Sequence, residues 1–120
     1  MKSGWHIALA LVVGLSLTAC VATPPSIYYW GDYSQTAYQL KKEPSEQTKQ
    51  AHQACLEDIV AHAVEKNKRI PPGIYAELAL LQLEDGLTAE AFASLQQEKK
   101  LFPESATLID ALQQKMTQGK

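Results

Sequence analysis

Residues 72–103, PGIYAELALLQLEDGLTAEAFASLQQEKKLFP, decide the fold of this chain. Apolar residues recur at helical spacing before and after Gly86, and this glycine suits the left-handed conformation that often ends a helix. The stretch therefore predicts two helices, over 72–84 and 89–101, with Thr88 as the N-cap of the second. The connection between them is short, which favours an antiparallel pair.

Three further segments show the same spacing, over 33–42, 46–68 and 106–117. The apolar stripe of the 46–68 segment consists of Ala51, Cys55, Leu56, Ile59, Val60, Ala63 and Val64. We place the end of this helix shortly before Pro71, because a proline disfavours helical backbone at the residue that precedes it. No strand-length alternating run competes with these patterns, so the sequence predicts an all-α fold of antiparallel helical hairpins.

The hairpin at 72–103 resembles the tetratricopeptide repeat, in which two helices cross at small residues. The agreements lie at Tyr75, Leu78, Ala79, Gly86, Ala91 and Pro103, and the departures at Gln82, Leu95 and Glu98. One degenerate repeat cannot bury both of its faces, so we expect the preceding helices to cover one side and the last helix the other. Such repeats mainly bind proteins or peptides. The alternative is a helical bundle without a peptide groove.

The first nineteen residues, 1–19, have the layout of a signal peptide. Lys2 supplies the positive charge, residues 7–17 form an apolar run, and small residues precede Cys20. The apolar run is shorter than the roughly 20 residues that a membrane-spanning helix needs. We therefore expect a signal peptide helix that is removed from the mature protein.

The motif Leu17-Thr18-Ala19-Cys20 resembles the bacterial lipobox. The resemblance implies lipid attachment to the Cys20 thiol, cleavage before this residue and acylation of the new amino terminus, so that several acyl chains give stable anchoring. Val21 stands where inner-membrane lipoproteins of enterobacteria usually carry Asp, which implies export to the outer membrane. The alternatives are an ordinary signal peptide cleaved nearby and an uncleaved anchor. Residues 20–27 are then a lipidated tether, and 28–120 are the helical domain.

Aromatic residues gather at the start of the helical domain, at Tyr28, Tyr29, Trp30 and Tyr33. Their amphipathic rings suit contact with a partner or with the bilayer surface, so they are our candidate partner-binding residues. They equally suit folding back as a hydrophobic staple onto the first hairpin. The spacing of Asp32 and Gln35 predicts a capping box for the first helix.

Cys55 is left without a partner if Cys20 carries lipid. Its neighbours at helical spacing are apolar, which indicates a small buried group rather than a reactive thiol. An intermolecular bridge and a redox role are the alternatives.

The sequence offers no motif for catalysis or for cofactor binding. A net charge of −2, spread over both signs, gives no electrostatic footprint for nucleic acid. His52 and His62 are too far apart in sequence to act as a metal pair on one helical turn, and we expect His62 to be a solvated helix residue. Phosphate-binding loops, nucleophile elbows and Cys-x-x-Cys pairs are absent. We therefore expect no metal, no cofactor, no enzymatic activity and no small-molecule substrate.

Several motifs are specific as a set: Tyr28-Tyr29-Trp30-Gly31-Asp32-Tyr33-Ser34, Tyr38, Lys42-Glu43-Pro44-Ser45, Pro71-Pro72-Gly73-Ile74-Tyr75-Ala76-Glu77 and Phe102-Pro103-Glu104-Ser105. The set resembles the lipoprotein family called domain of unknown function 4810, over nearly all of the mature chain. The resemblance assigns no catalytic role. It implies an assembly with other envelope lipoproteins, one similar to the curli-export pore protein and one similar to a small surface lipoprotein of neisserial type.

The sequence thus predicts a non-enzymatic scaffold or accessory subunit of a bacterial envelope complex. Its partners are the membrane, through the lipid anchor, and other envelope lipoproteins; a periplasm-facing position at the outer membrane is favoured over a surface-exposed one. One alternative is a ligand-binding or enzymatic lipoprotein with a pocket that uses Glu77 or His62. Another is a spacer between the membrane and the cell wall.

Overall fold

A computed structural model of the chain describes residues 24–118. Its α-helices are α2 Tyr33–Lys42, α3 Glu46–His62, α4 Ile74–Glu84, α5 Thr88–Leu101 and α6 Ala106–Gln118, with a 3₁₀ turn at Pro103–Ser105. No strand forms within 24–118, where an isolated bridge joins Tyr28 to Arg69, so the predicted all-α fold is confirmed. None of the helices in this range is long and apolar enough to cross a membrane. The predicted signal peptide and Cys20 lie outside the described residues.

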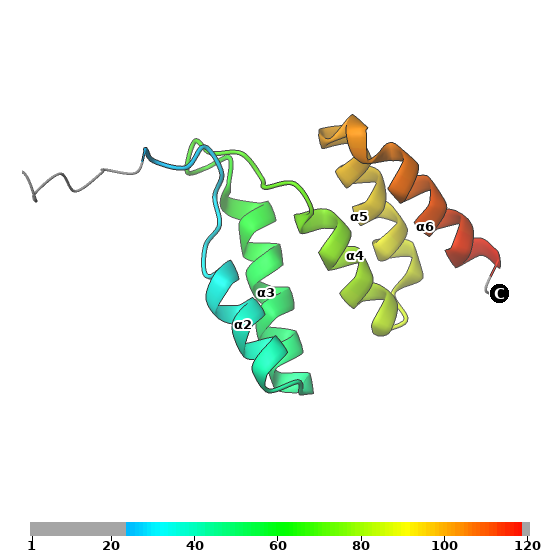
Figure 1. Cartoon of the computed structure of the whole chain (residues 1–120), viewed down its shortest axis with the longest axis horizontal. Helices are drawn as coiled ribbons and strands as arrows, with labels where there is room; N and C mark the ends of the chain where they lie inside the picture. Colours follow the sequence, from blue (N-terminus) through cyan, green and yellow to red (C-terminus); the bar gives the residue numbers. More distant parts are fainter. Residues whose placement is uncertain (1–23, 119–120) are drawn as a thin grey trace, which may run out of the picture.

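The helices form an array in which each one packs against its neighbours in sequence (Figure 1). The first hairpin consists of α2 and α3, the second consists of α4 and α5, and α6 lies against α5. The N-terminal segment leaves the array beside the end of α3, whereas α6 lies at the other side (Figure 1). Residues 24–27 and the last helix are therefore at opposite sides of the domain (Figure 1).

Two hydrophobic clusters hold this array together, and α4 contributes to both. The first cluster joins α3 to α4 through Cys55, Leu56, Ile59, Ile74, Leu78 and Leu81. The second joins α4, α5 and α6 through Ala79, Ala91, Leu95 and Ile109. The alanines at 79 and 91 are fully buried, and their small side chains allow α4 and α5 to approach closely. The buried position of Cys55 agrees with the prediction for its side chain.

The regular part of α3 ends at His62 and not at Lys68 as predicted. Asn67 takes the left-handed conformation, with φ of 52°. Around it, the amide of Lys68 donates to the carbonyl of Ala63 and the amide of Asn67 donates to that of Val64, both at 2.9 Å. This is the Schellman arrangement, which satisfies carbonyl groups left free at a helix end. Asn67, which precedes Pro71 by four residues, therefore ends the helix, and not the proline on which the prediction relied.

The predicted stripe of α3 is correct at its centre and wrong at its ends. Cys55, Leu56, Ile59 and Ala63 are buried, but Ala51 is exposed and Val64 is 79% exposed. Val64 lies in the turn that follows the regular helix. The histidine at position 52 is fully buried instead.

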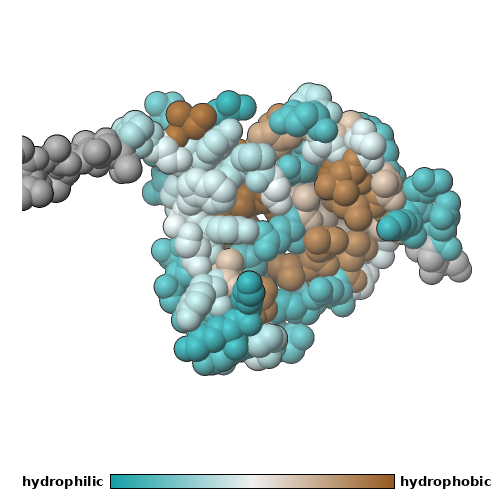
Figure 2. All heavy atoms as spheres, in the orientation of Figure 1, coloured by the Kyte–Doolittle hydropathy of each residue, from teal (hydrophilic) through white to brown (hydrophobic). Residues whose placement is uncertain are grey.

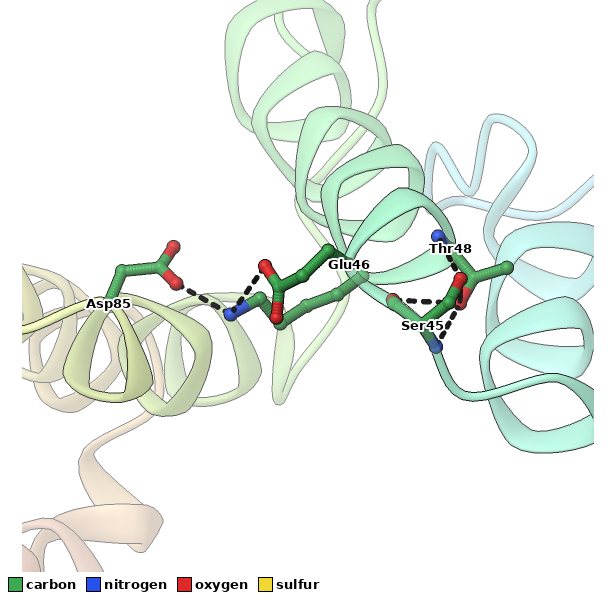
Figure 3. A network of polar contacts seen from close by, with 5 residues as sticks. Ser45, Glu46, Thr48 and Asp85 are labelled. Carbon is green, nitrogen blue, oxygen red and sulfur yellow. Dashed lines mark hydrogen bonds and ion pairs between the residues drawn. The ribbon is translucent and has the colours of Figure 1, made fainter.

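Helix starts also differ from the predictions. No side-chain capping bond forms at Asp32. Leu87 occupies the N-cap position of α5, so Thr88 is the first helical residue rather than the cap. The capping box lies instead at the start of α3, where the Ser45 side chain accepts from the Thr48 amide and the Thr48 hydroxyl accepts from the Ser45 amide (Figure 3).

Candidate functional site

The aromatic segment folds back along the turn that connects α3 to α4. The amide of Tyr29 donates to the carbonyl of Arg69 at 3.0 Å, and the amide of Arg69 donates to the carbonyl of Ile27 at 2.9 Å. The Arg69 guanidinium lies 5.8 Å from the ring centre of Tyr28, and the Lys66 ammonium 5.3 Å from that of Tyr29. Backbone pairing and cation–π contacts thus hold this segment against the domain.

Two of the four aromatic residues complete the core. Tyr29 and Tyr33 are half-buried and pack against the cluster between α3 and α4. The Tyr29 hydroxyl donates to Asp58 Oδ2 at 3.0 Å, and this hydrogen bond, followed by burial, raises the pKa of Tyr29 above its usual value. Trp30 is 41% exposed and contacts Tyr28 and Tyr33 with its ring. The fold-back interpretation therefore describes Tyr29 and Tyr33, whereas the Trp30 ring remains partly exposed to solvent.

A polar network lies between the two hairpins, centred on Glu77 of α4. Its Oε2 accepts a hydrogen bond from the Tyr33 hydroxyl at 2.8 Å, and its Oε1 lies 3.0 Å from Nε2 of His52. The other ring nitrogen of His52, Nδ1, lies 2.8 Å from the Thr36 hydroxyl. The network thereby joins α2, α3 and α4.

The partners decide the proton positions on His52. An ionised carboxylate only accepts hydrogen bonds, so Nε2 of His52 carries the proton that points to Glu77. Nδ1 then accepts from the Thr36 hydroxyl, for which it is a closer acceptor than the Tyr33 carbonyl at 3.2 Å. Both ring nitrogens of His52 therefore have a hydrogen-bond partner.

The network fastens the two hairpins to each other, and its histidine is not placed to exchange a proton with a substrate. His52 is 0% exposed, and a general base must reach the proton that it removes. Burial, and secondly the hydrogen bond to Glu77, raise the pKa of Tyr33 to about 12. The Tyr33 hydroxyl therefore remains a donor to Glu77 at physiological pH.

A second polar link joins the start of α3 to the end of α4. The Lys49 ammonium of α3 lies 2.6 Å from Asp85 Oδ1, beyond the end of α4, and 3.5 Å from Glu46 Oε2 (Figure 3). The hydrogen bond to Asp85 is the main reason why the pKa of Lys49 is raised. The contact between α3 and α4 thus combines the apolar cluster with two polar links.

His62 does not take part in the Glu77 network. Its Nδ1 lies 2.9 Å from Asp58 Oδ1, one turn earlier on α3, and its side chain is about half-exposed. Glu77 and His62, the residues named for an enzymatic alternative, therefore belong to separate contacts. Within residues 24–118, no group of three potential ligands is placed to hold a metal ion.

A separate apolar surface lies between the start of α5 and the end of α6. A groove of about 580 Å³ is lined there by Thr88, Ala89, Phe92, Met116 and Thr117. Phe92 is 40% exposed although it sits in a helix between two alanines. Sequence reasoning missed this groove. The available signal was Phe92, a large apolar residue out of phase with the core residues Ala91 and Leu95.

One face of the array carries its hydrophobic surface mainly on the second hairpin (Figure 2). Figure 2 shows that hydrophobic residues gather over α4 and α5 on the visible face, while the α2 and α3 half of that face is mostly hydrophilic. Exposed apolar residues of α4 and α5 include Leu80 and Phe92. Contiguous exposed apolar surface of this kind marks interaction sites in soluble proteins.

The chain resembles one known family over most of its length. The family described as Domain of unknown function (DUF4810) matches residues 27–112. The chain belongs to this family. The match begins at the aromatic segment and runs into α6, so the family domain includes the Glu77 network and both clusters. No curated protein and no solved structure matches the chain.

Proposed function

We propose that the protein is a lipid-anchored, non-enzymatic accessory subunit that binds another protein of the bacterial envelope. The observation that carries the proposal is the groove between α5 and α6, which leaves Phe92 exposed at the open end of a helical array. In an array of this kind, each helix is covered by the next one, and the last interface is free. A helix of a partner protein suits this position, because an amphipathic helix can lay its apolar face into such a groove.

The anchor in this proposal is Cys20, and its support is the Leu17-Thr18-Ala19-Cys20 motif. The partner class is another envelope lipoprotein, such as one similar to the curli-export pore protein, and the support is the family resemblance. We propose the outer membrane, with the domain facing the periplasm, because Val21 follows the cysteine. The four aromatic residues remain candidates for a second contact, of which Trp30 is the most exposed.

The anchor is tested by metabolic labelling with radioactive palmitate. The full chain should be labelled and recovered with membranes, and the Cys20→Ala variant should lose both properties. Labelling that persists in the variant would refute the assignment of Cys20.

Partner binding is tested by co-purification from membranes solubilised in mild detergent. The Phe92→Asp variant should lose a partner protein that the unmodified chain retains, because a carboxylate in the groove cannot be desolvated without a counter-charge. Tyr38→Asp is the matched control, since Tyr38 is an exposed aromatic residue on α2, in the other hairpin. Equal recovery of the partner with both variants would contradict the groove as the binding surface.

A further inference from the structure

One side of the array combines exposed apolar residues with a concentration of positive charge. We call this side the tether edge and define it as residues 26–28, 63–71 and 100–105. Val64, Lys68, Arg69, Ile70, Leu101 and Phe102 line a shared cavity of about 220 Å³ on it. Since this cavity joins the turn after α3 to the end of α5, the segments form one continuous surface.

We infer that the tether edge rests on the bilayer surface and contacts anionic phospholipid headgroups. This inference rests on the proposed lipid anchor and adds an orientation of the domain to it. The occupant is lipid, rather than protein, for two reasons that are visible in the chain: the charge of the edge, and its distance along the chain from Cys20.

The charge of the tether edge is opposite to that of the chain as a whole. It carries the cations Lys66, Lys68, Arg69 and Lys100 and the carboxylates Glu65 and Glu104. The excess of cations contrasts with the net charge of −2 for the whole chain. Each cation close to an anionic membrane strengthens the attraction about fivefold, provided that it lies within the screening length of the salt solution.

The apolar residues on the tether edge are of the types that insert at the boundary between headgroups and acyl chains. Val64 is 79% exposed and Ile27 is 60% exposed, beside the half-buried ring of Tyr28. Aliphatic and aromatic side chains surrounded by Lys and Arg are the composition of interfacial membrane-binding surfaces. Within the domain, the side chains of Val64 and Ile27 remain largely exposed to solvent.

Chain connectivity keeps the tether edge near the anchor. Ile27 is held to Arg69 by a backbone hydrogen bond of 2.9 Å, and it follows Cys20 by seven positions. Since an extended chain spans at most about 3.6 Å per residue, Ile27 lies within about 25 Å of Cys20. The described part of the chain begins on this same side of the array (Figure 1). The groove between α5 and α6 lies at the start of α5, whereas the tether edge includes the end of α5, so the groove remains open to a protein.

The inference is tested with a fluorescent label on the chain recovered from bacterial membranes and reconstituted into vesicles. Val64→Cys introduces a reactive thiol on the tether edge, while the native thiol of Cys55 is buried. Leu87→Cys is the matched control: Leu87 is an exposed aliphatic residue in the turn between α4 and α5, at the opposite edge. The vesicles consist of phosphatidylethanolamine with or without phosphatidylglycerol, and brominated acyl chains quench a label that enters the bilayer boundary.

With phosphatidylglycerol, we expect quenching at Val64 to be at least threefold stronger than at Leu87. This excess should fall when the salt concentration is raised to about 1 M, at which the screening length is only about 3 Å. The double variant Lys66→Gln with Lys100→Gln should weaken it likewise, whereas Lys41→Gln with Lys42→Gln, at the far end of α2, should not.

Equal quenching at both positions would overturn the inference while leaving the lipid anchor intact. Protection of the Val64 label in native membranes, but not in pure lipid vesicles, would also overturn it and assign the edge to a protein. A chain that does not sediment with vesicles at all would contradict the anchor itself, and with it this contact.

Discussion

Removing the Glu77 carboxylate should loosen the two hairpins from each other. In the Glu77→Leu variant, the proton on His52 Nε2 loses its acceptor at a fully buried position. A buried donor without a partner costs about 1–3 kcal/mol. The Tyr33 hydroxyl also loses Glu77, but it is only half-buried and regains part of this energy from water, which leaves a cost of about 0.5 kcal/mol. The free energy of unfolding should therefore fall by about 1.5–3.5 kcal/mol.

Urea unfolding of the full chain in detergent, followed by far-ultraviolet circular dichroism, measures this change. Thermal unfolding should show a midpoint lower by roughly 10–20 °C, since about 1 kcal/mol shifts a domain of this size by roughly 4–8 °C. Glu84→Leu is the matched control, because Glu84 is an exposed carboxylate at the end of the same helix. It should change stability by less than about 0.5 kcal/mol.

A double-mutant cycle separates the network from general damage to α4. Tyr33→Phe should cost about 1 kcal/mol in the unmodified chain and almost nothing in the Glu77→Leu background, because the hydrogen bond is then already absent. If Glu77→Leu is as stable as Glu84→Leu, or if the two costs simply add, the network does not fasten the hairpins.

Four further changes test individual parts of the structure. The pKa of Tyr33 is raised to about 12 in the folded state, which therefore holds this proton more tightly than the unfolded state does. The free energy of unfolding should fall by about 1–2 kcal/mol between about pH 10 and 12. In urea unfolding at a series of pH values, the Tyr33→Phe variant should lack this decrease. Ser45→Ala should lose about 1 kcal/mol with the capping box of α3, and Ser45→Gly only a few tenths; equal losses would argue against side-chain capping. Gly73→Ala should cost about 1–2 kcal/mol, because Gly73 has φ of +93° and no atom lies close enough to clash with an added methyl group; an unchanged midpoint would contradict the backbone explanation. Asp85→Asn should lower the pKa of Lys49 toward its ordinary value, as followed by NMR titration of the ammonium group, and an unchanged pKa would show that the contact does not persist in solution.

Local signals in the sequence were sufficient for much of the fold. The bounds of α2 agree with the prediction, and α5 and α6 each differ by one residue at one end. Proline and glycine mark the breaks near these helices, and such residues act through their own backbone. Asn67 acts in the same local way, so the end of α3 is also encoded by a local signal in the sequence.

The candidate site could not be predicted in the same way, because its contacts join distant parts of the chain. His52 pairs with Glu77, twenty-five positions away, and Tyr33 with the same carboxylate at forty-four. A polar residue on an otherwise apolar helix face gives no information about such a partner. The groove beside Phe92 depends on which helix comes last in the array. Helical periodicity shows which residues share a face, but it does not show whether another helix covers that face.

Site-specific photo-cross-linking in living cells tests the central claim, that the groove between α5 and α6 binds an envelope protein. A photoreactive amino acid placed at Ala89, which lines the groove, should cross-link one protein reproducibly, and Phe92→Asp in the same chain should abolish the product. The same amino acid at Ala54, an exposed alanine of α3, should give no such product. Cross-linking of the same protein from both positions, or of none from Ala89, would contradict the claim.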